Sequence, residues 1–177
     1  MAEPSVAEFT RLVDALVSRG EPLELDTAVK LAEEISKAFA VKADEVAILK
    51  TTADEKFLQF VIPAKFQNLG TIPVNSTSAL SARTAREKRP EILNNFTIAR
   101  HTTVFEAVPL DQKRGDPIQK IMSVPISHES KVTGVIQVSR KGKTMTSSGP
   151  DFTPRELSEL SSYAAQVARF LALIPTR

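Results

Sequence analysis

The chain has 177 residues, of which 42% are hydrophobic, which is enough for the core of one domain and too many for a disordered chain. Its net charge of +2 is too small to indicate nucleic-acid binding, and it contains no cysteine. The lack of cysteine excludes disulfides, thiolate nucleophiles and sulfur-ligated metals together.

Charge is distributed unevenly along the chain. Residues 1–60 carry seven basic and twelve acidic side chains, whereas residues 61–177 carry sixteen and nine. The second part therefore either faces an anionic ligand or partner, or is an ordinary charged surface. No stretch is apolar enough to predict a membrane span, and the N-terminus shows no basic region followed by an apolar one. We therefore expect a cytoplasmic protein that contacts neither membrane nor nucleic acid.

Two helices are predicted first, over residues 5–18 and 27–40. Ser5 and Glu8 have the spacing of a capping box, Gly20 is a natural stop, and Asp26 is a candidate cap for the second helix. The apolar stripe of the first helix is Val6, Phe9, Val13 and Leu16, and that of the second is Ala28, Leu31, Ala32, Ile35 and Phe39.

Short segments rich in β-branched and aromatic residues then predict an antiparallel sheet. A first hairpin is expected over residues 45–50 and 57–62, an edge strand over 69–74, a helix over 78–88 and a short strand over 91–93. Residues 94–119 predict loops with a short helix near 104–108. A second hairpin follows over 121–127 and 132–139, with Pro125 indicating a bulge or an unpaired position. Thr153, Pro154 and Glu156 then begin a helix that runs to about residue 173.

The two terminal helices carry apolar stripes with spacings of three and four residues. Both stripes face the sheet of their own chain, or one of them meets the matching helices of a second chain. The last helix is apolar on more than one side, which favours the second alternative and predicts a homodimer through the terminal helices. The candidate interface residues are Phe9, Val13, Leu16, Leu160, Ala164, Val167 and Leu171.

The motifs of common enzymes and nucleotide-binding proteins are missing. The glycines form neither a dinucleotide fingerprint nor a P-loop, and there is no nucleophile elbow. The only histidines are His101 and His128, with no spacing that predicts a metal site, and His128 is expected in a surface turn. We therefore expect no catalytic residues, no metal and no cofactor.

Several strings resemble the GAF family of small-molecule-sensing domains. Residues 123–126 and 132–138 are similar to its last two strands, 151–157 continuing into 164–168 to its final helix, and 70–74 before a helix ended by Arg89 and Pro90 to its middle segment. The similarity spans about residues 24–173. It implies an α+β fold with three layers: a central antiparallel sheet of about six strands, terminal helices on one face, and middle helices and loops on the other. Residues 1–23 would then be an N-terminal dimerisation helix.

In this family the ligand pocket lies between the sheet and the middle layer, here about residues 75–118. The resemblance thus implies a partly apolar cleft for a small anionic or aromatic ligand. The candidate binding residues are Arg83, Phe96, Arg100, His101 and Phe105. The alternative is that the two phenylalanines are core and the arginines are solvated.

Three functions are compatible with these residues. The first is a regulatory or sensory homodimer that binds a small molecule, and the second is a structural dimerisation or protein-interaction module without a ligand. The third is a cofactor-free enzyme that uses Arg100 and His101. Family enzymes that reduce free methionine sulfoxide use cysteine pairs, so the lack of cysteine excludes that activity.

Overall fold

The computed structural model describes residues 5–20, 24–68, 70–96 and 116–174, together with the backbone of 103–104 and 108–109. The helices are α1 (Val6–Arg19), α2 (Leu25–Ala38), α3 (Leu80–Glu87) and α4 (Pro154–Leu171), and the short 3-10 helices are η1 (Ala43–Glu45) and η2 (Ala64–Phe66). The strands are β1 (Val46–Thr51), β2 (Phe57–Ile62), β3 (Thr71–Pro73), β4 (Glu91–Leu93), β5 (Thr103–Val104), β6 (Val108–Pro109), β7 (Ile118–His128) and β8 (Lys131–Lys141).

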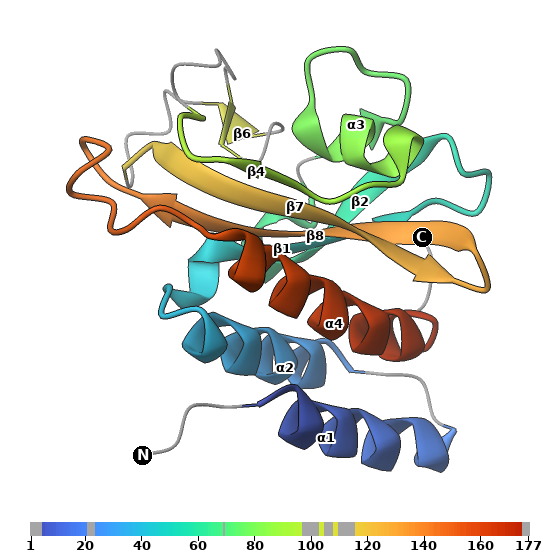
Figure 1. The fold of residues 1–177 in the computed structure, drawn as a ribbon. Helices are drawn as coiled ribbons and strands as arrows, with labels where there is room; N and C mark the ends of the chain where they lie inside the picture. Colours follow the sequence, from blue (N-terminus) through green and yellow to red (C-terminus); the bar gives the residue numbers. More distant parts are fainter. Residues whose placement is uncertain are drawn as a thin grey trace.

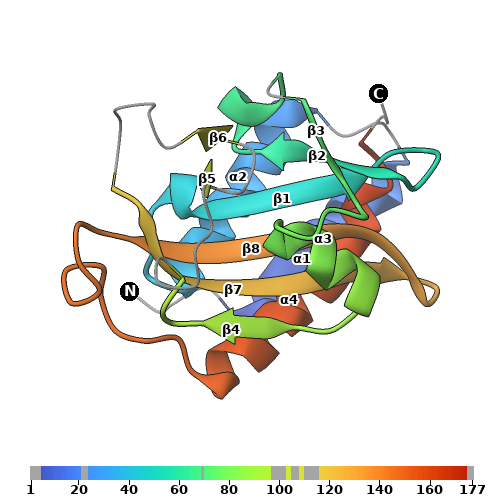
Figure 2. The same cartoon turned by 90° about the horizontal axis from the view of Figure 1, so that it is seen from above.

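Six strands form one sheet in the order β3-β2-β1-β8-β7-β4, and every neighbouring pair is antiparallel. The long hairpin of β7 and β8 lies between β1 and the edge strand β4 (Figure 2). This confirms both predicted hairpins and the short strand over residues 91–93. Pro125 pairs in register with Val135, and the register of the β7–β8 ladder shifts only after the next residue, between Ile126 and Ser127.

One element was predicted wrongly. A short helix was expected near residues 104–108. The structure instead has a strand residue at each end of this range, because Val104 and Val108 pair with each other in the two-stranded ladder of β5 and β6. Both residues are β-branched, which favours a strand over a helix when the chain turns back on itself.

Helices cover both faces of the sheet and make an α/β/α sandwich (Figure 1). On the lower face in that view, α4 packs mainly on β7, and α2 packs on β1 and β2. On the upper face, α3 contacts β7 and β8. The two faces of the sheet therefore have separate apolar cores, and alternate residues of each central strand point into one or the other.

Helix α1 lies outside this sandwich and packs against α4 on the side away from the sheet (Figure 1). Its N-terminus is capped as predicted, because the backbone N–H of Glu8 donates to Ser5 Oγ at 3.2 Å. Asp14 forms an ion pair with Arg169 of α4 at 2.7 Å. Phe9 packs edge-on against Tyr163 and Phe170 of α4, with ring centroids 5.2 and 6.3 Å apart.

The stripes proposed as a dimer interface are therefore covered within one chain. Phe9 and Val13 of α1 are at most 2% exposed, and Leu16 is half-buried against the same core. The four candidates on α4 are also buried, at 2% exposure or less: Leu160, Ala164, Val167 and Leu171. Pairing of two chains stays a prediction, and in this arrangement of α1 the contact would use other side chains.

Candidate functional site

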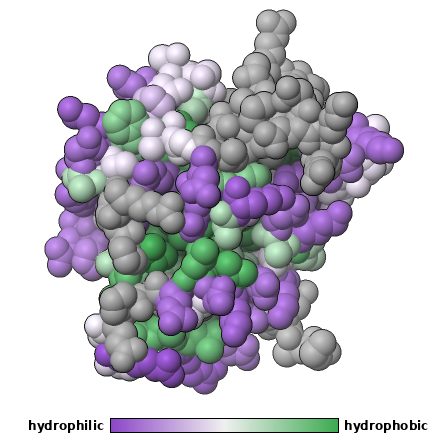
Figure 3. Space-filling model, turned by 180° about the vertical axis from the view of Figure 1, so that it is seen from behind, coloured by the Kyte–Doolittle hydropathy of each residue, from purple (hydrophilic) through white to green (hydrophobic). Residues whose placement is uncertain are grey.

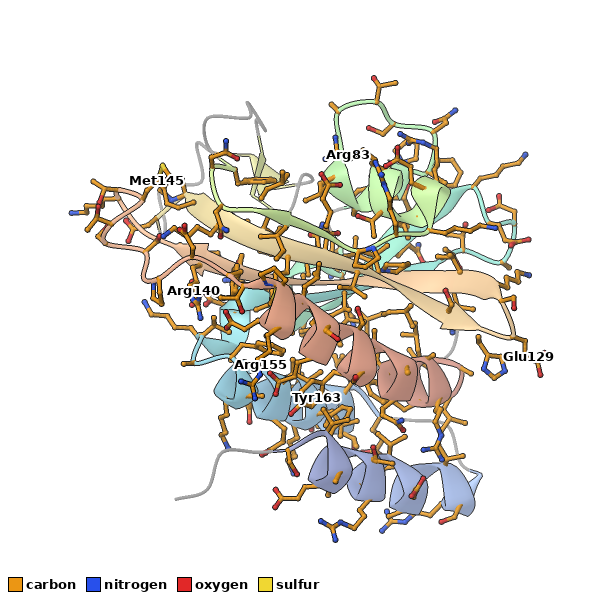
Figure 4. All side chains as sticks on the ribbon, viewed as in Figure 1. Arg83, Glu129, Arg140, Met145, Arg155 and Tyr163 are labelled. Atoms are coloured by element: carbon orange, nitrogen blue, oxygen red, sulfur yellow. The ribbon has the colours of Figure 1, made fainter. Side chains whose placement is uncertain are left out.

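The upper face of the sheet is where the resemblance places a ligand pocket, and two of the five candidate residues can be located there. Arg83 extends from α3 toward β4 and holds Glu91 through two contacts, Nε to Oε1 at 3.2 Å and Nη2 to Oε2 at 2.7 Å. Its guanidinium charge is therefore matched by a carboxylate, and the pair fastens α3 to the edge of the sheet. Figure 4 shows Arg83 among the side chains of this upper layer.

Phe96 belongs to the upper core. It is 2% exposed, and its backbone N–H donates to the carbonyl of Gln119 at 2.9 Å. Its place in this core is the alternative that the sequence left open for the phenylalanines. Arg100, His101 and Phe105 lie outside the described residues, so their role as binding residues stays a prediction.

A buried polar cluster on this face was not singled out from the sequence. It joins Gln137 of β8, Ser123 of β7 and Thr84 of α3, all at most 1% exposed, and Ser81 is buried one turn earlier on α3. Gln137 Nε2 donates to Ser123 Oγ at 3.1 Å, and the hydroxyls of Ser123 and Thr84 are 2.6 Å apart. Thr84 Oγ1 in turn donates to the carbonyl of Leu80 at 2.9 Å.

Strand alternation places this cluster. In β8, Ile136 and Val138 point into the lower core, so Val135 and Gln137 point upward. Ser123 lies directly across from Gln137 in the register of β7 and β8. The signal in the sequence is a glutamine within a strand that is covered on both faces, where a polar side chain has no route to water.

One atom of the cluster has no hydrogen-bond partner within the described part of the chain. Gln137 Oε1 is buried and receives no proton, although the nitrogen of the same amide is bonded. Leaving a buried acceptor unsatisfied costs about 1–3 kcal/mol, and such atoms are rare in folded proteins. The oxygen is therefore suited to accept a hydrogen bond from a molecule that enters this layer.

A second buried polar cluster, at the far end of the sheet, is fully engaged in structure. Arg140 donates to the carbonyls of Phe39 and Pro150 at 3.0 and 2.7 Å and stacks on the ring of Phe152, 4.1 Å from its centroid. Lys120 donates to Gly149 O at 2.6 Å and pairs with Asp151. Figure 4 shows Arg140 beside the start of α4, where these contacts hold the loop that leads into that helix.

Hollows lie along the helical side of the sheet. One, a cleft of about 410 Å³ between α1, α2 and α4, is lined by Phe9, Leu12 and Tyr163, by the carboxylates of Glu8 and Glu34 and by the cation of Arg11. Burial, together with the nearby carboxylates of Glu159, Glu34 and Glu8, raises the pKa of Tyr163 to about 12. A smaller hollow of about 270 Å³ lies between α2 and the end of β2. Seen from behind, the lower half of the molecule exposes some hydrophobic surface (Figure 3).

Features of other site classes are missing from the described residues. They hold no group of three metal-ligating side chains, and none of their helices is long and apolar enough to cross a membrane. His128 lies exposed near the turn between β7 and β8, as the sequence predicted, with its Nε2 3.9 Å from a carboxylate oxygen of Glu129.

Together, the three layers define an α+β domain in which helices cover both faces of a six-stranded antiparallel sheet. A family model described as the GAF domain matches residues 25–172, so the chain belongs to the GAF domain family. No curated protein matches the sequence.

Solved structures show the same fold. The GAF domain of an Acinetobacter phosphoenolpyruvate-protein phosphotransferase superposes with a TM-score of 0.66 at 15% identity, covering 94% of this chain and 92% of that one. The corresponding domain from Coxiella burnetii gives 0.65 at 12% identity, covering 97% and 95%. The free methionine-R-sulfoxide reductase of Neisseria meningitidis, solved with its substrate, gives 0.61 at 13% identity, covering 95% and 89%.

Proposed function

We propose that this chain is a regulatory GAF module that binds a small molecule on the upper face of its sheet, beside α3, and that it has no catalytic activity. The observation that carries the proposal is the buried oxygen of Gln137, which lacks a donor among the described residues. Membership in the GAF family supports the same face, because the resemblance places the ligand between the sheet and the middle layer. Arg100, His101 and Phe105 are proposed to complete the site from that layer.

Substitution of Gln137 separates binding from folding. Gln137→Leu removes the unsatisfied oxygen, and Ser123 keeps its contact with Thr84. We expect the unliganded variant to be as stable as the parent chain or more stable, by up to about 1 kcal/mol. A ligand found by thermal shift against a metabolite library would stabilise the parent chain and lose most of that effect in the variant.

The matched control makes the same chemical change on the other side of the molecule. Gln166 of α4 is half-buried and accepts from Arg169 at 2.9 Å, so Gln166→Leu also replaces a glutamine with leucine. It should leave the ligand-induced shift unchanged. A ligand that stabilises Gln137→Leu as strongly as the parent chain would show that it binds elsewhere, and the proposed site would be wrong.

The proposal that the protein is not an enzyme rests on its side chains. The chain has no cysteine, so the thiol chemistry of family members that reduce free methionine sulfoxide has no nucleophile here. Turnover of any substrate that is abolished by His101→Ala would revive the enzymatic alternative.

A homodimer remains part of the proposed function, as does a cytoplasmic location. Since α1 covers the outer side of α4, the proposed dimer would form around α1 rather than through the stripe residues. Light scattering at micromolar concentration that gives the mass of a single chain would contradict it.

A structural interaction module is the alternative function, and one observation favours it. The described upper core is closely filled by aromatic and aliphatic side chains, including Phe60, Phe66 and Phe96. In that case no metabolite stabilises the parent chain, and Gln137→Leu changes nothing except the free energy of unfolding.

A further inference from the structure

One set of directions gives the polar cluster its largest number of hydrogen bonds. In that set the single proton of the Thr84 hydroxyl goes to the carbonyl of Leu80, 2.9 Å away. The proton in the 2.6 Å contact between Thr84 and Ser123 then comes from Ser123. Ser123 has then used its only proton, so it can only accept from Gln137.

This direction determines which end of the Gln137 amide is available. The nitrogen must face Ser123 Oγ, 3.1 Å away, because a carbonyl oxygen in that place would meet a second lone pair. Turning the amide would also bury an unpaired NH2 group, at a further cost of about 1–3 kcal/mol. Gln137 is thus held as an acceptor by two residues, Ser123 and Thr84, which lie 14 and 53 positions before it in the sequence.

The surroundings of this acceptor carry no unmatched charge among the described residues. Gln137 lies between Ala47 on β1 and Ser123 on β7 in the sheet register, and Ile121 and Val135 belong to the same apolar core. Arg83 of α3 is paired with Glu91.

From this geometry we infer that the ligand carries an N–H or O–H donor on a largely apolar body, and that Gln137 selects it through that donor. The inference rests on the proposed function and gives its site a ligand class. Gln137 is the specificity-determining residue, and Ser123 and Thr84 are positioning residues that hold its amide in the accepting orientation.

Thr84 provides the decisive variant, because it acts on the ligand only through the other two residues. In Thr84→Val the shape of the side chain is kept and the hydroxyl is lost. Ser123 then has a proton to give to Gln137 Oε1, so the amide turns and presents its NH2 group instead. The preference of the site should change from ligands that donate to ligands that accept.

Matched probes test this inference by NMR on the 15N-labelled full chain. The probes form two pairs of closely similar shape. Indole is paired with benzofuran and pyrrole with furan, and only the first member of each pair has an N–H donor. We expect the parent chain to bind the N–H member of each pair about tenfold more tightly than the oxygen member. This ratio of dissociation constants corresponds to about one net hydrogen bond. The side-chain amide resonance of Gln137, assigned by its loss in Gln137→Leu, should shift on binding. Thr84→Val should bind benzofuran and furan more tightly than the donors.

The outcomes separate this inference from the proposed function. Equal binding of both probes in each pair, tighter binding of the oxygen heterocycles to the parent chain, or failure of all four probes to bind would overturn the ligand class. The proposed function would survive if the metabolite library still yields a ligand whose binding is abolished by Gln137→Leu. A Thr84→Val variant that weakens both members of each pair equally, with its fold confirmed by an unchanged backbone spectrum, would show that Thr84 has only a structural role.

Discussion

Truncation of Phe9 tests whether α1 packs on its own chain. Phe9 is 2% exposed and makes edge-on contacts with the rings of Tyr163 and Phe170. Replacing a buried phenylalanine by alanine costs about 3–5 kcal/mol. Because Phe9 also lines the open cleft between α1, α2 and α4, the space left behind is not sealed, and we expect a loss near 3 kcal/mol. That is a large share of the roughly 5–15 kcal/mol that stabilises a domain.

The assay is urea unfolding of Phe9→Ala and of the parent chain at 5 and 500 µM, values chosen to span about two decades around a typical dimer dissociation constant. If Phe9 packs within one chain, the loss in the free energy of unfolding is the same at both concentrations. Leu12→Ala on the same helix is the control. Leu12 is 48% exposed, so its truncation should change stability by less than about 0.5 kcal/mol.

Two results would refute this reasoning. One is a loss below about 1 kcal/mol for Phe9→Ala. The other is a concentration dependence of unfolding in the parent chain that Phe9→Ala removes. The first result would mean that Phe9 is not packed against α4, and the second that it contacts a second chain, as the sequence suggested.

Three further predictions concern packing, burial and ionisation. Gly134→Ala should lower the urea midpoint by the equivalent of about 1–3 kcal/mol, because the new Cβ would clash with the carbonyl oxygen of Leu49. Arg140→Met should lower the melting temperature through a loss of at least about 2 kcal/mol, since two backbone carbonyls lose their donor. Tyr163, the sole tyrosine, should ionise near pH 12 in an ultraviolet titration of the folded chain, because burial raises its pKa to about 12. The unfolded chain loses this proton near pH 10, so stability should fall as the pH rises from 10 to 12.

Much of the fold could be predicted from local sequence patterns. Thr153 and Glu156 form the expected capping box at the start of α4, with contacts of 3.2 and 3.1 Å, because that motif depends only on residues three positions apart. The strand over residues 91–93 and both hairpins were predicted for the same reason. The prediction that Asp26 caps the second helix is wrong, because α2 begins at Leu25 with Glu24 in the N-cap position and Asp26 lies in its first turn.

Long-range packing limited the prediction of the interface. The sequence showed correctly that α4 is apolar on more than one side. A second chain was one way to cover the apolar side that does not face the sheet. In the structure the sheet covers one side of α4, and α1 covers another with Phe9 and Val13. A stripe shows that a helix side is buried, but it does not show whether the covering element belongs to the same chain.

The candidate site shows a related limit. Thr84, Ser123 and Gln137 are each unremarkable in sequence, and their cluster exists only because α3 crosses β7 and β8 on the upper face. Arg83 attracted attention as a cation, yet its contact with Glu91 of β4 matches its charge. The sequence could indicate the layer in which the site is proposed, whereas the partner of each polar side chain required the fold.

The two buried polar clusters differ in a way that bears on function. At the end of the sheet, the charged groups of Arg140 and Lys120 contact carbonyls and carboxylates, as expected where polar groups hold a loop in place. Under α3, the cluster is equally buried but ends in one unsatisfied oxygen on Gln137, which a leucine of similar size would avoid. A structural role explains the first arrangement and leaves the second with a cost and no benefit. Recognition of a donor on a ligand supplies that benefit, and this is why Gln137, rather than the more conspicuous arginines, is the residue to substitute first.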